Sequence, residues 1–369
     1  MAPRHAAPAR GRRRLGIVLA ATAIVVIAVG AGFALAPSTI GAPSAGAATH
    51  GPLLVRAITP SGSVVSPDAP LRVVFNNPLG ASSPMPTVLP RVAGTWAHLS
   101  ASEISFRPTV PMIPGTRYAV VVPPTTTATN GTMLHREVVA RFTVATGSSL
   151  RLNQLLAQLG YLPLRFVPTG PFHPTSSAAQ RGSFTWRWTN VPTGLTGLWR
   201  PNAYTVITQG AIMAFESARG LPTDGVASPA VWDALLHAVA THHVSTATYN
   251  YVDVNTALPQ TLTVYVNMRP IYHTLVNTGI SVRPTALTTT PVFLRFVTTT
   301  MSGTNPDGSH YSDPGIPWVS YFHGGDALHG FIRPGYGYPQ SDGCVEMPIS
   351  NAAVVFPLTP LGTLVTVQA

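Results

Sequence analysis

The sequence contains no lysine, only 9% charged residues and a single cysteine, Cys344. One cysteine excludes an intrachain disulfide framework. Few charges combined with 45% hydrophobic residues exclude a disordered chain. All basic residues other than histidine are arginines, and they form no basic stripe with interleaved aromatic residues, so we expect no nucleic-acid partner. The formal net charge of +10 instead predicts attraction to an anionic surface, such as membrane lipid or a cell-wall polymer.

The N-terminal residues 1–36 have the pattern of a membrane or signal segment. Arginines at positions 10 and 12–14 precede an uncharged apolar run over residues 15–36. At about 1.5 Å per residue such a run spans roughly 30 Å, the thickness of a bilayer core. Arginines on the N-terminal side predict that the rest of the chain is exported. Two outcomes stay open, a retained signal anchor and a signal peptide cleaved near residues 45–47.

A flexible linker and a β-sandwich are expected next. Residues 37–51 consist largely of Pro, Ser, Gly and Ala, which is typical of a linker. Over residues 52–147, short stretches of alternating apolar residues are separated by Pro and Gly, as at Leu71-Val73-Phe75 and Tyr118-Val120-Val122. This spacing predicts an immunoglobulin-like β-sandwich, and no catalytic residue is apparent in it.

Residues 148–241 change to a helical period. Apolar residues recur at helical spacing from Leu152 to Leu159, from Ile207 to Phe215 and from Trp232 to Val239, and Gly160 follows the first run as a helix-terminating residue. Together with Gly220-Leu221 and Asp224-Gly225-Val226, these runs resemble the three-helix peptidoglycan-binding module. The insertion at residues 163–201 departs from that compact pattern.

Residues 246–369 return to strand patterns. Alternation at Leu262-Val264-Val266, Val292-Leu294-Phe296 and Thr363-Val365-Val367 predicts strands. A short helix is expected over Ser350 to Phe356, with Ser350 as its N-cap. The expected fold class is therefore a multidomain, mainly β protein: a membrane or signal segment, a sandwich, a small three-helix module and a mostly β catalytic domain.

Cys344 is the candidate nucleophile of this domain. A cysteine nucleophile needs a base that takes its proton, and His329 is the natural candidate because the glycines at 335 and 337 can turn the chain back. Backbone amides at Gly343 and Cys344 could form an oxyanion hole. Two other interpretations are a buried inert cysteine and a metal site of His310, His323, His329 and Cys344. The metal site lacks the short ligand spacing of zinc sites, so we expect no metal and no cofactor.

The stretch from Gly324 to Gly330, with His329-Gly330, and the stretch from Tyr338 to Pro348, with Ser341-Asp342-Gly343-Cys344-Val345-Glu346, resemble the L,D-transpeptidase signature. The resemblance extends over about residues 254–367. It implies that Cys344 attacks a peptidoglycan stem tetrapeptide at its third residue, that D-alanine leaves, and that the acyl group passes to an amine of a second stem. It also implies that His329 is the general base, oriented by the backbone of Gly330, and that carbapenems acylate the cysteine.

Two positions differ from the family pattern. Asp342 stands where the family has histidine, and Glu346 where it has arginine. A carboxylate beside the thiol raises the pKa of Cys344 by like-charge repulsion unless it is turned away or paired. Arg333 either replaces the missing arginine in holding a stem carboxylate or forms a surface pair with Glu346. The residues expected to contact substrate are Ser341, Asp342, Arg333 and Tyr321.

The sequence thus predicts an exported L,D-transpeptidase at the outer face of the cytoplasmic membrane or in the cell wall. Its expected partners are peptidoglycan stem peptides and glycan, with residues 1–36 contacting the membrane. Two alternatives remain: a thiol carboxypeptidase or endopeptidase, in which water accepts the acyl group, and a wall-binding protein whose Asp342 and Glu346 mark impaired catalysis. The oligomeric state is not predicted.

Overall fold

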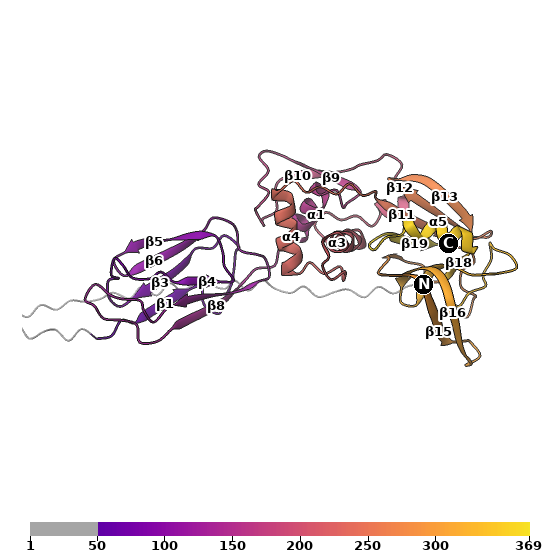
Figure 1. Ribbon diagram of the computed structural model, residues 1–369. Helices are drawn as coiled ribbons and strands as arrows, with labels where there is room; N and C mark the ends of the chain where they lie inside the picture. The colour runs from indigo at the N-terminus through magenta and orange to yellow at the C-terminus, as the bar shows by residue number, and fades with distance from the viewer. Residues whose placement is uncertain (1–50) are drawn as a thin grey trace, which may run out of the picture. The chain divides into compact units, whose positions relative to one another are not determined.

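The structure is a computed structural model that describes residues 51–369 (Figure 1). The predicted membrane or signal segment and all but the last residue of the predicted linker lie outside the described residues. Among residues 51–369, no helix is both long enough and apolar enough to cross a bilayer.

The predicted β-sandwich consists of two four-stranded sheets around one hydrophobic core. The strand orders are β1-β3-β6-β5 and β2-β8-β7-β4. Alternate residues of β3, such as Leu71 and Val73, are fully buried between the sheets, as the alternating sequence predicts. The strands are β1 (Val55–Thr59), β2 (Val64–Val65), β3 (Leu71–Phe75), β4 (Thr87–Leu89), β5 (Gly94–Ser100), β6 (Glu103–Pro108), β7 (Arg117–Val122) and β8 (Val138–Val144).

The helical region contains three main helices whose ends follow from their capping residues. The hydroxyl groups of Ser148, Thr205 and Ser228 accept backbone N–H bonds at the three N-termini, and Gly220 ends the second main helix in the left-handed conformation. The elements are α1 (Ser149–Gln158), β9 (Leu164–Pro168), β10 (Gly182–Trp186), α2 (Thr193–Thr196), α3 (Val206–Arg219) and α4 (Pro229–Ala240).

The insertion at residues 163–201 forms the β9–β10 hairpin and α2, and polar side chains of α1 hold the chain between the two strands. Arg151 is fully buried, and its guanidinium donates to the carbonyls of His173, Pro174 and Ser176 at 2.9–3.1 Å. Gln154 exchanges hydrogen bonds with the backbone of Gln180. A buried arginine needs such partners to offset its desolvation. The insertion at residues 163–201 is therefore an ordered part of the helical region.

Glu216 of α3 is fully buried with only one of its two carboxylate oxygens paired. Oε2 accepts the Gly225 N–H at 2.9 Å, while Oε1 has no partner among the described residues. Burial is the main cause that raises the pKa of Glu216 to about 7, and the neighbouring Asp224 raises it further. The carboxyl group is therefore more easily protonated in the folded protein than in the unfolded chain.

This raised pKa predicts that stability falls as the pH rises. The contribution of Glu216 is fully present below its unfolded pKa of 4.5 and is lost as the pH rises through the folded value of about 7. Glu216→Gln should raise the apparent melting temperature at about pH 8 and change it little at about pH 5. Thermal unfolding of both proteins tests this, with the exposed Glu137→Gln as the matched control. Equal effects of Glu216→Gln at the two pH values would contradict it.

Two further sheets and one helix build the C-terminal domain. Their strand orders are β13-β12-β11-β19-β14 and β15-β16-β17-β18, and both sheets contribute to one core with α5. The elements are β11 (Asn250–Asn255), β12 (Thr261–Val266), β13 (Arg269–Leu275), β14 (Thr289–Pro291), β15 (Leu294–Thr304), β16 (His310–His323), β17 (Asp326–Gly330), β18 (Val345–Met347), α5 (Ile349–Val355), a 3₁₀ turn (Phe356–Leu358) and β19 (Leu364–Gln368).

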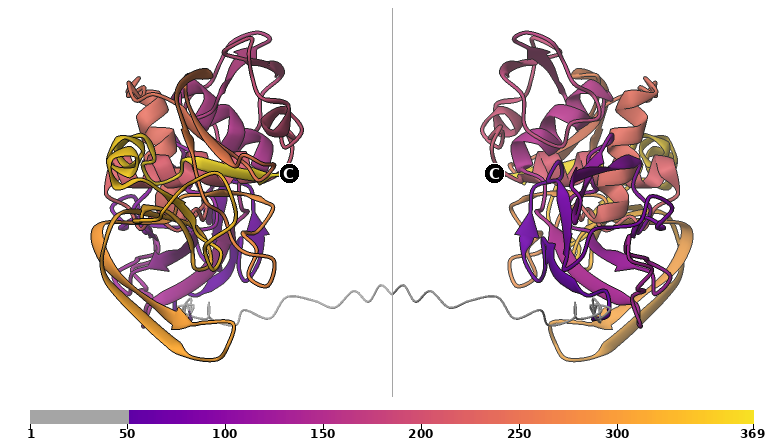
Figure 2. Two further views of the ribbon diagram at one scale, coloured as in Figure 1. Left: turned by 90° about the vertical axis from the view of Figure 1, so that its right-hand side faces the viewer. Right: turned by 90° about the vertical axis from the view of Figure 1, so that its left-hand side faces the viewer.

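Two local predictions in this domain hold only in part. Of the predicted strand Val292-Leu294-Phe296, Leu294 and Phe296 belong to β15, whereas the buried Val292 lies between β14 and β15. Leu294 and Phe296 are exposed, because β15 and β16 form a long hairpin that extends away from the core (Figure 2). Helix α5 begins at Ile349 with Pro348 at its N-cap position and no side-chain capping bond, so Ser350 lies inside the helix.

The helical region and the C-terminal domain share one hydrophobic cluster. Tyr251 of β11, Met268 and Leu364 of β19 are buried in the same cluster as the leucines of α1 and α4. Gly210 of α3 lies against the backbone of Gly362, at a spacing that leaves no room for a Cβ. The predicted boundary between residues 241 and 246 is thus crossed by a continuous core.

Candidate active site

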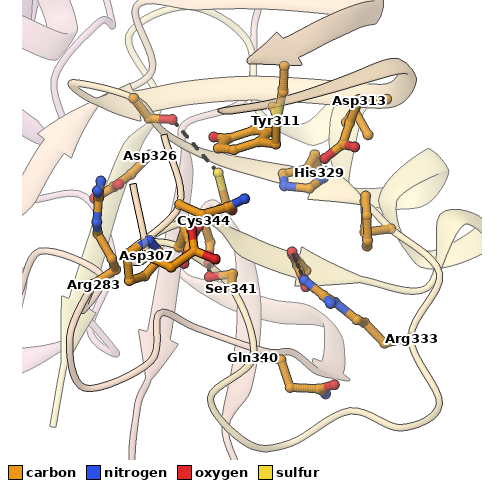
Figure 3. A pocket seen from close by; sticks show the side chains of 18 residues that line it. Arg283, Asp307, Tyr311, Asp313, Asp326, His329, Arg333, Gln340, Ser341 and Cys344 are labelled. Atoms are coloured by element: carbon orange, nitrogen blue, oxygen red, sulfur yellow. Dashed lines mark hydrogen bonds and ion pairs between the residues drawn. The ribbon is translucent and has the colours of Figure 1, made fainter. Parts of the chain in front are cut away.

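Strands β17 and β18 bring His329 and Cys344 to the same cavity. They are parallel neighbours with Leu328 opposite Val345 and His329 opposite Glu346. Cys344 immediately precedes β18, so the crossover of residues 331–344 returns the chain beside the strand that carries His329. The cavity they line measures about 750 Å³. Figure 3 shows the Cys344 sulfur directed toward Tyr311, with the His329 ring to one side.

The local structure selects one tautomer of His329. Its Nδ1 lies 3.1 Å from the Gly330 carbonyl oxygen, which can only accept a hydrogen bond. Nδ1 therefore carries the proton when the ring is neutral, and Nε2 is the basic nitrogen. His329 is only 3% exposed, and this burial lowers its pKa below the ordinary value of 6.5. The ring is therefore neutral at neutral pH and able to accept a proton.

The turn before Cys344 is built from Ser341 and Gly343. The buried Ser341 hydroxyl donates to the Cys344 carbonyl at 2.5 Å and accepts the Gly343 N–H at 3.2 Å. Gly343 has φ +120°, and a Cβ there would lie 2.5 Å from Oδ1 of Asp326. Glycine is thus required both by the backbone conformation and by the nearby carboxylate. At rest the Gly343 amide, expected as an oxyanion donor, is bonded to Ser341.

The sulfur of Cys344 is protonated in this environment. Burial is the main cause that raises the pKa of Cys344 to about 12. The Ala327 amide lowers this pKa, whereas the carboxylates of Asp326, Glu346 and Asp342 raise it, in that order. Sγ lies 3.7 Å from the Gly325 carbonyl oxygen. The effect that the sequence suggested for Asp342 is present, but it is smaller than those of burial and of the two other acids.

The cavity is strongly acidic. Five of the twelve acidic residues of the chain line it, whereas the only arginines among its lining residues are Arg283 and Arg333. Asp313 and Tyr311 come from β16, and Tyr311 packs over Gly303 of β15, where a Cβ would meet its ring at 2.8 Å. The acidic lining residues are Asp307, Asp313, Asp326, Asp342 and Glu346.

Arg333 is paired with Glu346 inside the cavity. Its Nε and Nη2 donate to the two carboxylate oxygens at 2.7 and 2.8 Å. The side chains are 28% and 6% exposed, so this is a partly buried bidentate pair and not the surface pair considered from the sequence. Nε and Nη2 are occupied, and the guanidinium also lies over the Phe331 ring, 4.7 Å from its centre.

Asn277 fixes the crossover that forms one wall of the cavity. Its side chain donates to the Gly335 carbonyl at 3.0 Å and accepts the amides of Gly337 and Tyr338. Its backbone exchanges two hydrogen bonds with Glu346, at 2.8 and 2.9 Å. Asn277 is fully buried, so these bonds are shielded from water.

The C-terminal domain matches one known family of catalytic domains. Residues 249–367 match the family model of the YkuD L,D-transpeptidase catalytic domain. This confirms the family resemblance of the C-terminal domain. A search of curated proteins gives no match.

Solved structures of L,D-transpeptidases are similar to the chain at low identity. One from Mycobacterium smegmatis is 12% identical and covers 86% of this chain and 100% of its own, with a TM-score of 0.30. L,D-transpeptidase 3 from Mycobacterium tuberculosis, with a faropenem-derived adduct, is 11% identical over 85% of this chain and 98% of its own, with a TM-score of 0.30. The Enterococcus faecium catalytic domain is 24% identical over 34% of this chain and 100% of its own, again with a TM-score of 0.30. These likenesses add no evidence of activity.

In the C-terminal domain, five predicted site residues meet at the cavity: Cys344, His329, Ser341, Asp342 and Arg333. Gly330 supplies the carbonyl beneath His329, and Gly343 shapes the turn. Tyr321 is not among the lining residues; its ring packs against Phe293 and Phe296. Sequence reasoning missed the cavity residues Tyr311, Asp313 and Asp326. Only Asp326 carried a signal, its position just before the His329 motif.

Proposed function

We propose that the protein is an exported L,D-transpeptidase that cross-links peptidoglycan stem peptides through a thioester on Cys344. The observation that carries this proposal is the arrangement of Cys344 and His329. The buried imidazole, with Nδ1 fixed by the Gly330 carbonyl, shares one cavity with the sulfur inside the segment that matches the catalytic-domain family. The proposal includes export and anchoring in the cytoplasmic membrane, which the apolar run at residues 15–36 supports.

The protonation states support general-base catalysis and not a preformed thiolate. Both the raised pKa of Cys344 and the lowered pKa of His329 favour a neutral thiol beside a neutral imidazole. As sulfur attacks the carbonyl carbon of the stem peptide, its proton passes to Nε2 of His329. The imidazolium then protonates the leaving amine, so that D-alanine departs and the thioester remains.

The second half of the reaction reverses these proton movements. An amine of a second stem attacks the thioester carbonyl and loses a proton to His329. The C–S bond breaks, and the sulfur recovers a proton as the new peptide bond forms. Five acidic side chains around the cavity attract the acceptor while it is still an ammonium group, which gives one proton to solvent to become the attacking amine. This negative charge favours an amine acceptor, and therefore cross-linking.

Intact-mass spectrometry with a carbapenem tests the proposal. Ring opening of the β-lactam loses no atoms, so the full mass of the compound should be added to one site, Cys344. The absence of an adduct on the wild-type protein would overturn the catalytic proposal and support a wall-binding protein with impaired catalysis. A donor tetrapeptide, supplied with and without an acceptor stem, separates the two enzymatic alternatives. Tripeptide without cross-linked dimer would indicate a carboxypeptidase.

A further inference from the structure

His329 and Glu346 lie side by side on β17 and β18. They are register partners in a parallel pair, so their side chains lie on the same face of the sheet. Both are almost fully buried, at 3% and 4% exposed, and both line the cavity. A carboxylate therefore stands one strand away from the proposed base, where the family pattern has an arginine.

Arg333 contacts both Glu346 and Phe331, and each of these lies beside the His329 imidazole. It binds both oxygens of Glu346 and covers the Phe331 ring. The Phe331 ring in turn meets the His329 ring edge to face, with centres 6.0 Å apart and planes at 90°. His329 thus contacts Phe331, Phe331 contacts Arg333, and Arg333 binds Glu346, which is the neighbour of His329 on the adjacent strand.

The position of Arg333 is set by the backbone around it. The Tyr336 hydroxyl donates to the Phe331 carbonyl at 2.6 Å and accepts the Arg333 amide at 3.3 Å. The Asn277 side chain fixes the next residues of the same crossover. The Arg333 backbone is therefore fixed independently of its side chain. The guanidinium loses little further conformational entropy when it binds Glu346, so the ion pair is pre-organised.

We propose that Arg333 and Glu346 are positioning residues for His329, and that their ion pair holds Phe331 against the imidazole and balances the charge beside it. The inference rests on the proposed function, in which His329 is the base. It assigns Arg333 to the protein's own carboxylate and not to a carboxylate of the stem peptide. A carboxylate at position 346 then requires a cation on the crossover, and Arg333 supplies it.

The Arg333–Glu346 pair can be tested through the pKa of His329, because both residues affect that pKa. Glu346 of β18 and Asp313 of β16 raise the pKa of His329, and Arg333 of the crossover lowers it. The Cys344 thiol shares the same cavity. Arg333→Gln leaves the Glu346 carboxylate without its counter-charge, which favours the imidazolium form of His329. The pH at which the acylation rate falls on acidification should therefore move to a higher value. Glu346→Gln leaves the guanidinium without its counter-charge and should move that pH to a lower value.

The experiment uses the full-length protein and two readouts. The first is the carbapenem acylation rate as a function of pH. The second is the His329 titration by NMR with labelled histidine, assigned from the signal missing in His329→Gln. Each single variant should lower the plateau acylation rate by about tenfold, and the two should shift the His329 titration in opposite directions. The charge-exchanged double variant R333E/E346R should restore much of the lost rate.

Each outcome distinguishes the possible causes. Rate losses without opposite titration shifts would show a merely structural role and overturn the proposal, as would unchanged rates. The neutral double variant R333Q/E346Q leaves no unpaired buried charge, so it retains the fold if a single variant does not. Glu103→Gln, which breaks the exposed Arg72–Glu103 pair of the sandwich at 3.5 Å, should change neither readout. If the wild type forms no carbapenem adduct, the proposed function fails, while the NMR titration still decides the role of the pair.

Discussion

Replacing Cys344 by alanine should abolish both carbapenem acylation and stem-peptide cross-linking. Removing a nucleophile that acts through a covalent intermediate leaves no alternative path, so we expect a loss of at least about 10⁴-fold, to background. The chain has no other cysteine, so no second thiol can produce residual adduct. Intact-mass spectrometry measures the adduct, and chromatography of released stem peptides measures the cross-link.

A matched control separates this loss from misfolding. Ser350→Ala changes an exposed residue of α5 outside the cavity and should acylate at the wild-type rate. Cys344→Ala itself removes one atom from a half-buried site, so its melting temperature should stay close to that of the wild type. An adduct on Cys344→Ala would place the reacting group elsewhere in the chain and end the thioester mechanism.

Replacing His329 by glutamine should slow acylation by about 10²- to 10⁴-fold at neutral pH, the usual contribution of a positioned general base. Glutamine keeps a polar side chain at this position, but its amide is not basic and cannot take the thiol proton. In the wild type, burial keeps the imidazole neutral below the ordinary pKa of 6.5, so the rate should fall only at more acidic pH. Single-turnover acylation across a pH series measures both effects.

His323 supplies the comparison for this variant. It is exposed at the end of β16, with Nδ1 3.6 Å from the Asp326 carboxylate, and it does not line the cavity. His323→Gln should therefore acylate at close to the wild-type rate. If His323→Gln were slow and His329→Gln normal, the base would have been assigned to the wrong residue.

Sequence patterns predicted those elements in which burial alternates regularly. Leu71, Val73 and Phe75 of β3 and Leu262 and Val264 of β12 point into cores, because one face of each sheet excludes water. In the pattern Val292-Leu294-Phe296 only Val292 is buried, because the chain leaves the core there and β15 forms a hairpin, in which Leu294 and Phe296 stay exposed. Alternation predicts a strand, but not whether anything covers it.

The site could be predicted only as far as its local motif extends. His329, Gly343 and Cys344 lie within one short stretch of the chain, and their residue types indicate thiol chemistry. Tyr311 and Asp313 reach the cavity through the fold of the β15–β16 hairpin, and nothing in their neighbourhood in the sequence indicates this. Likewise, the residue types of Arg333 and Glu346 allowed a pair, but only the parallel register and the fixed crossover determine its bidentate geometry.

The core shared by the helices and the C-terminal domain limits how this protein can be dissected. A fragment that begins near residue 246 would expose the apolar surfaces of Tyr251, Met268 and Leu364, which the helices now cover. Such a fragment is liable to aggregate, and its loss of activity would carry no information about wall recognition. Whether the helices contact the cell wall is better tested by substitutions on their exposed face than by deletion.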